Sequence, residues 1–341
     1  MNPEELLRQA FEARAGRVEV APDALGTIRR RITGARPRRR ALTIGLASLA
    51  TTAAAVAATV ALALPRDVAM PPGATTDGTP TQTATPSPTL TGVTTRVPVY
   101  YRAAKGNRLY REFHPVTLPA DGLEDRVRAA VGLMLRGAPA DPDYTASWPR
   151  DSSVRSVRLD GAVVVVDLAG VSGNDVGAAA ATASVQQLVW TVTAVTADWD
   201  LNRPAGDRVN VTGVRLLVDG RRAARLWGQV DVSGDLVRAD ADRTLGLVWL
   251  ISPQHGDTVN QEFTVHIAGK VPESNVILRV LTPTGGIVKS ELVTLGEGSL
   301  TRPEAHVRLT LAPGGYTIEA YYESPDDDSV QALDDHAITV R

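Results

Sequence analysis

The sequence predicts an α+β protein with a single N-terminal transmembrane helix, then a domain of sheet and helices, then an all-β sandwich. Three observations predict this class. Residues 41–64 contain no charged side chain, residues 97–240 alternate strand-like and helix-like periods, and residues 245–341 contain only strand-like stretches. The length of 341 residues suits two domains of ordinary size beside the membrane segment.

The apolar run at residues 41–64 is 24 residues long, and about 20 suffice for a helix to cross the hydrocarbon core. Seven arginines lie between positions 29 and 40, whereas only Arg66 closely follows the run. The positive-inside rule therefore places residues 1–40 in the cytoplasm as a short tail and the domains outside, in a single-pass protein of the cell membrane. A cleaved secretory signal is the alternative, because Ala61-Leu62-Ala63 offers small residues for cleavage.

Residues 65–96 are predicted to be a Pro/Thr-rich linker. Its central part, residues 71–90, contains five prolines and seven threonines, a composition that cannot bury a core and that keeps the chain extended. A glycosylated stalk and an unmodified spacer both fit this composition, and we favour the spacer.

The domain expected at residues 97–240 follows the order strand, strand, helix, strand, strand, helix, strand, strand. Asp121 is the expected N-cap of the first helix, and Asp160-Gly161 predicts a hairpin with a type I′ turn. Unbroken valines at 163–166 indicate a central strand that is covered on both faces. The predicted strands are 97–101, 109–116, 154–159, 162–168, 211–218 and 221–226, and the predicted helices are 122–136 and 176–198.

The domain expected at residues 245–341 contains short alternating stretches that are separated by turn residues, which is typical of a β-sandwich. Its seven predicted strands are 247–252, 262–267, 275–281, 287–293, 306–311, 315–322 and 336–340.

Several of these segments resemble the GerMN domain of bacterial sporulation and germination proteins. The resemblance covers about residues 97–228, and its most specific parts are Asp160-Gly161 joined to Val166-Asp167-Leu168 and the helix segment Gln187-Leu188-Val189-Trp190-Thr191. In the second domain, Ile251-Ser252-Pro253 and Pro313-Gly314-Gly315-Tyr316 resemble the immunoglobulin-like domain of spore-germination proteins. The resemblance implies a binding or scaffolding role at the cell wall. Many GerMN proteins are lipoproteins, whereas this chain has no cysteine.

Composition excludes several function classes. The absence of cysteine excludes disulfides, thiol catalysis and Cys-ligated zinc. Outside residues 1–40, which hold ten arginines and five acidic residues, the chain carries 26 basic and 33 acidic side chains, so its body is acidic and nucleic acid is not an expected partner. No motif of a serine hydrolase, a phosphate-binding loop, a dinucleotide site or a zinc protease occurs, so we expect neither an enzyme nor a cofactor.

Four groups of residues could still carry chemistry. Trp148, in a loop between Ser147 and Pro149, is the candidate ligand-binding residue, because an aromatic ring can stack on a sugar. The carboxylates of Asp167, Asp198 and Asp200 could act as acid and base on a glycoside, although aspartate at the ends of strands and helices is also common in turns. Calcium binding and a solvated turn are the alternatives for Asp326-Asp327-Asp328. The remaining candidates, the five histidines, share no metal-ligand spacing: His114, His255, His266, His306 and His336.

These patterns together predict a non-enzymatic, membrane-anchored envelope protein. Its expected partners are the membrane, through one helix, and a cell-wall polymer or envelope protein, through the outer domains. A wall-modifying enzyme and a single-span sensor with a cytoplasmic tail are the alternatives.

Overall fold

The computed structural model describes residues 92–299, 302–324 and 326–341, which lie within one compact unit, Leu90–Arg341. The predicted tail, the predicted transmembrane helix at 41–64 and nearly all of the linker lie outside the described residues. Within the described part of the chain, no helix is both long enough and apolar enough to span a bilayer.

The first domain begins with an antiparallel sheet in the order β2-β1-β3, formed by β1 (Val93–Ala103), β2 (Leu109–Leu118) and β3 (Tyr144–Thr145). Between β2 and β3 the chain forms α3 (Leu123–Arg136), one residue shorter than predicted. Gly137 ends the helix in the left-handed region at φ 60°, as expected of a C-terminal glycine. The N-cap is Gly122 rather than the predicted Asp121, because the Asp121 carboxylate accepts a hydrogen bond from Arg126 at 2.6 Å instead.

A second sheet has the order β4-β5-β6-β7, from β4 (Ser153–Asp160), β5 (Val163–Ala169), β6 (Gly213–Val218) and β7 (Arg221–Arg222). Strand β5 is central and its interior residues are buried, which confirms the prediction from the valine run. The β4–β5 hairpin is confirmed, but its turn consists of Gly161 and Ala162, and only Gly161 has positive φ. That pattern fits a type II′ turn and not the predicted type I′.

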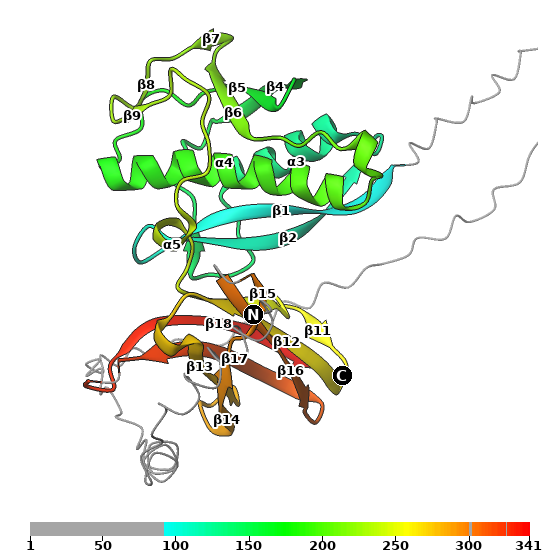
Figure 1. Ribbon diagram of the computed structural model, residues 1–341, viewed down its shortest axis with the longest axis vertical. Coiled ribbons are helices and arrows are strands. Elements are labelled where there is room, and N and C mark those ends of the chain that lie inside the picture. The colour runs from blue at the N-terminus through cyan, green and yellow to red at the C-terminus, as the bar shows by residue number, and fades with distance from the viewer. Residues whose placement is uncertain (1–91, 300–301, 325) are drawn as a thin grey trace, which may run out of the picture. The chain divides into compact units, whose positions relative to one another are not determined.

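Helix α4 (Ala178–Leu201) connects β5 to the parallel strand β6. Figure 1 shows α3 and α4 lying between β1 and β2 on one side and β4, β5 and β6 on the other, so the helices are covered by two sheets rather than packed on one. Residues from Ala183 to Thr196 of α4 are therefore buried almost without interruption. Polar side chains in this stretch bind β1: Thr191 accepts the Tyr100 N–H at 3.0 Å, and Gln187 donates to the Tyr100 carbonyl at 2.8 Å.

The predicted strand 221–226 is divided in two. Its second part is β8 (Arg225–Leu226), which pairs with β9 (Val230–Asp231) in a separate sheet. Two short helical turns complete this domain, η1 (Ala205–Asp207) and α5 (Ala241–Thr244).

The second domain is a sandwich of two sheets, with its own core between them. All seven predicted strands are present, and the structure adds the short strands β11 and β15. One sheet has the order β10-β12-β16-β15, from β10 (Val248–Ser252), β12 (Glu262–Gly269), β16 (Arg302–Thr310) and β15 (Glu297–Ser299). The other has the order β11-β18-β17-β13-β14, from β11 (Thr258–Val259), β18 (Val330–Val340), β17 (Gly314–Glu323), β13 (Asn275–Leu281) and β14 (Ile287–Thr294), with η2 (Pro272–Ser274) before β13.

The two domains meet through apolar and hydrogen-bonded contacts. Trp249 of β10 is buried in the core of the first domain, beside Tyr100 of β1. The Gln254 side chain binds both backbone groups of Phe113 on β2, accepting its N–H at 2.5 Å and donating to its carbonyl at 3.1 Å. At the connection, the Gly246 N–H donates to the Leu109 carbonyl at 3.1 Å.

Candidate functional site

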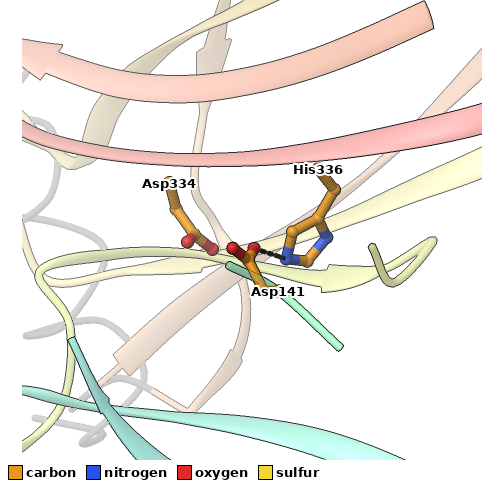
Figure 2. A group of neighbouring side chains, drawn as sticks. All are labelled: Asp141, Asp334 and His336. Atoms are coloured by element: carbon orange, nitrogen blue, oxygen red, sulfur yellow. Dashed lines mark ion pairs between the residues drawn. The ribbon is translucent and has the colours of Figure 1, made fainter. Parts of the chain in front are cut away.

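The described residues bring two carboxylates and two imidazoles together where the domains meet. Asp141 lies in the loop between α3 and β3, and His255 lies in the turn between β10 and β11. Asp334 and His336 lie two residues apart on β18, so alternation along the strand directs both side chains to the same face. Figure 2 shows Asp141 between the other two, with its carboxylate directed toward the His336 ring. One ligand atom each from Asp141, Asp334 and His336 lies within 4.8 Å of the others.

The Asp141 loop is held in place by Glu112 of β2. The Glu112 carboxylate accepts the backbone N–H groups of Ala140 and Asp141, both at 2.9 Å, and a third hydrogen bond from His114 at 2.8 Å. Burial raises the pKa of Glu112, but these hydrogen bonds outweigh burial and hold that pKa below its ordinary value.

Asp141 itself is 1% exposed, and its two oxygens differ. Oδ1 accepts the Asp143 N–H at 2.8 Å. Oδ2 is buried and has no hydrogen-bond partner among the described residues. It lies 3.6 Å from His336 Nε2 and 3.6 Å from His255 Nδ1. Burial raises the pKa of Asp141.

Asp334 binds one partner in each of the two domains. Oδ1 accepts the hydroxyl of Tyr144 on β3 at 2.7 Å, and Oδ2 accepts the N–H of Leu250 on β10 at 2.7 Å. Burial raises the pKa of Asp334 to about 6, although the neighbouring His336 and both hydrogen bonds lower it. The carboxylate is therefore a structural acceptor that retains one free lone pair on each oxygen.

The hydrogen bond of His336 determines which ring nitrogen is free. Nδ1 lies 2.7 Å from the Pro253 carbonyl, which can only accept, so Nδ1 carries the proton. In the neutral imidazole, Nε2 then has a lone pair, and Nε2 is the atom that faces Asp141. The His255 ring stands edge-on to His336 with 6.3 Å between ring centroids.

Comparisons with known proteins agree with the fold. The family model for the sporulation and spore germination domain, Germane, matches residues 98–224. The model for the immunoglobulin-like domain of bacterial spore germination, Gmad2, matches residues 247–329. The chain carries a GerMN domain followed by a spore-germination immunoglobulin-like domain. Both resemblances predicted from the sequence are thereby confirmed.

Solved structures similar to this chain include three that align with 43% of it. The first GerMN domain of the sporulation protein GerM from Bacillus subtilis is 20% identical, with 99% of that chain covered and a TM-score of 0.30. The tandem GerMN domains of the same protein are 14% identical, with 46% covered and a TM-score of 0.29. A candidate lipoprotein from Clostridium perfringens is 14% identical, with 87% covered and a TM-score of 0.29. A search of the curated proteins found no match.

Trp148, the predicted ligand-binding residue, lies in the core of the GerMN domain. Its side chain is 7% exposed and packs edge-on against Trp227, with 5.2 Å between centroids. Of the other tryptophans, Trp190 and Trp249 are buried as expected for core residues. A ligand-binding role for Trp148 stays a prediction.

The three candidate carboxylates of the GerMN domain each have a structural partner. Asp167, on β5, accepts the Gly220 N–H at 2.9 Å, and Asp200 accepts the Val209 N–H at 2.9 Å. Asp198 forms an ion pair with Arg126 at 3.6 Å. Asp200 also lines a hollow of about 280 Å³ at the end of α4. None of these contacts pairs two of the three carboxylates.

In the immunoglobulin-like domain, the Asp326-Asp327-Asp328 segment forms a turn. Asp327 accepts both the N–H and the hydroxyl of Ser329, at 3.1 and 2.7 Å. These hydrogen bonds lower the pKa of Asp327 and agree with the solvated turn that was one of the two alternatives.

Sequence reasoning missed the cluster of Asp141, His255, Asp334 and His336. Its members are separated by up to about two hundred positions, so no local spacing connects them. One signal was present: Asp334 and His336 share a strand face, but the predicted strand began only at residue 336, six residues after β18 begins.

Proposed function

We propose that the protein is a membrane-anchored cell-envelope protein whose two outer domains bind a cell-wall polymer or envelope protein in sporulation or germination, without catalysing a reaction. The observation that carries this proposal is the tandem arrangement of two germination-type domains, at residues 98–224 and 247–329, in one compact unit behind the uncharged run at 41–64. Such a run, preceded by an arginine-rich segment, supports anchoring with the domains outside.

The environment of the candidate acids supports a binding role over catalysis. General acid–base chemistry on a glycoside requires two carboxyl groups flanking one bond, with about 5 to 10 Å between them. Asp167 and Asp200 hold loops through backbone N–H groups, and Asp334 is occupied by Tyr144 and Leu250. Each of these carboxylates thus has a structural task that a catalytic acid would have to give up.

Cysteine labelling tests the anchoring. In intact cells, a cysteine introduced at Thr83 should react with a membrane-impermeant reagent, and one introduced at Thr33 should not. The chain has no native cysteine that would interfere with this labelling. Labelling of Thr33→Cys alone would reverse the orientation. Recovery of a soluble chain that begins near residue 64 would favour the cleaved signal.

Co-sedimentation tests the binding. The purified protein should sediment with cell-wall sacculi and should release no sugar or peptide fragments from them. Asp167→Asn, Asp198→Asn and Asp200→Asn are the matched variants. Reproducible release of fragments that one of these variants abolishes would replace the binding role with the wall-modifying enzyme.

A further inference from the structure

Where the two domains meet, the contacts of His255 and His336 with Asp141 differ from the other histidine–carboxylate contacts that the structure describes. His114 binds Glu112 at 2.8 Å, and His266 binds Glu304 at 2.7 Å, both within ordinary hydrogen-bond range. By contrast, two imidazole nitrogens converge on the same oxygen, Asp141 Oδ2, and both stop at 3.6 Å. The pairs of Asp141 with His255 and with His336 are therefore not ordinary hydrogen-bonded ion pairs.

The separation of 3.6 Å has a chemical meaning. Oxygen and nitrogen ligands bind zinc at about 2.0 to 2.2 Å, and in tetrahedral geometry such ligands lie about 3.3 to 3.6 Å from one another. Asp141 Oδ2 stands at this distance from His336 Nε2 and from His255 Nδ1. The carboxylate oxygen is thus spaced from each of the two nitrogens as two ligands of one ion are.

Burial supplies an independent reason. The Asp141 side chain is 2% exposed, yet its Oδ2 has no hydrogen-bond partner among the described residues, and the buried His255 Nδ1 has none either. An unpartnered buried carboxylate oxygen is costly, and the cost disappears when a cation occupies the space that it faces.

The surrounding contacts prepare these atoms for a metal. His336 donates its Nδ1–H to the Pro253 carbonyl, an orientation that leaves Nε2 free and that is common among metal-bound histidines. Glu112 holds the Asp141 loop through two backbone N–H groups. Asp334 lies within reach and keeps a lone pair on each oxygen as a fourth donor.

We propose that Asp141, His255, His336 and Asp334 form a zinc site that joins the GerMN domain to the immunoglobulin-like domain. Two imidazole nitrogens and two carboxylate oxygens match the ligand preference of zinc, whereas calcium takes oxygen ligands. Asp141 comes from the GerMN domain and the other three come from the immunoglobulin-like domain, so the ion stabilises the contact between them.

Zinc titration of the full chain, purified and freed of metal by chelation, tests the site. Asp141→Asn keeps the size of the side chain and the Oδ1 acceptor but removes the charge. His255→Ala removes a side chain that is 24% exposed, so it has little effect on folding. His266→Ala is the matched control, because His266 is 21% exposed and lies outside this cluster, where it binds Glu304 and stacks on His306. Circular dichroism of the metal-free proteins verifies that each variant is folded.

We expect the wild-type chain to bind one zinc ion by calorimetry and to develop the visible absorption of tetrahedral cobalt when Co²⁺ is added. Zinc should also raise its temperature of unfolding, because the ion binds only the folded state. Asp141→Asn and His255→Ala should weaken zinc binding by at least about tenfold. His266→Ala should bind as the wild type does, and calcium should not compete.

Three results would overturn the proposal. One is failure of the wild-type chain to bind zinc or to be stabilised by it. The second is unchanged zinc binding in both Asp141→Asn and His255→Ala. The third is an equal loss of zinc binding in His266→Ala, which would place the ion near Glu304.

Discussion

The Tyr144 hydroxyl of the GerMN domain donates a hydrogen bond of 2.7 Å to Asp334 of the immunoglobulin-like domain, and both residues are buried. The Tyr144 ring also stacks on Tyr110, with 4.9 Å between centroids. Because both groups are buried, each needs a hydrogen-bond partner from the protein. They can serve one another only while the two domains keep their relative position.

Tyr144→Phe removes only the hydroxyl and leaves one oxygen of Asp334 without its donor. We expect the free energy of unfolding to fall by about 1 to 3 kcal/mol, the cost of an unsatisfied buried acceptor. Urea denaturation of the purified protein measures the change. Tyr316→Phe is the control, since the Tyr316 hydroxyl binds the Ala312 carbonyl at an exposed position. Equal effects of the two substitutions would contradict the role of Asp334.

Gly246→Ala tests the connection between the domains. A Cβ atom at residue 246 would lie 2.3 Å from Cε1 of Tyr110, a buried ring that is held by its stacking on Tyr144. We expect destabilisation of about 1 to 3 kcal/mol from this overpacking, measured by urea denaturation. Gly234→Ala, where a Cβ meets nothing within 4 Å, should change stability little. A neutral Gly246→Ala would show that the connection can move away from β2.

Trp148→Ala is expected to lower the free energy of unfolding by about 3 to 5 kcal/mol, because it leaves a cavity beside Trp227. Trp199→Ala should cost less, since Trp199 is only partly buried and lies under the guanidinium of Arg203, 3.6 Å from the ring centroid. Chemical denaturation followed by circular dichroism compares them. A small loss of stability in Trp148→Ala would contradict a role in core packing and would favour the predicted ligand-binding role of Trp148.

The pKa of Asp235 should report its contact with Arg215. Arg215 donates two hydrogen bonds to this carboxylate, at 2.7 and 2.8 Å, and they lower the pKa of Asp235 below its ordinary value. A carboxyl group with a lowered folded-state pKa contributes stability above its unfolded pKa and loses that contribution as pH falls through the folded value. In Arg215→Gln, NMR titration should find the pKa of Asp235 raised. Asp231, whose pKa is lowered by Ser233, should not change.

The local sequence pattern predicted which segments form helices and strands better than it predicted what packs against them. The α4 segment was predicted as a helix at 176–198 from its apolar residues, but its coverage by two sheets depends on strands far away in the chain. The start of β18 was misplaced because Asp334 and His336 put polar side chains on the inner face, which breaks the alternation that indicates a strand. The same two residues belong to the cluster that they form with Asp141 and His255. What made the strand hard to predict therefore also marks the candidate site.

The two hydrogen bonds between the Gln254 side chain and the Phe113 backbone have a consequence for the GerMN domain when this domain is produced alone. Strand β2 is the outermost strand of its sheet, and the side-chain amide of Gln254 occupies the outward N–H and carbonyl of Phe113, while Gly246 occupies the Leu109 carbonyl. Without the immunoglobulin-like domain these backbone groups would be open to strand addition by another molecule. The second domain thus also protects the first against self-association, and a shortened GerMN fragment should be more prone to aggregate than the intact pair.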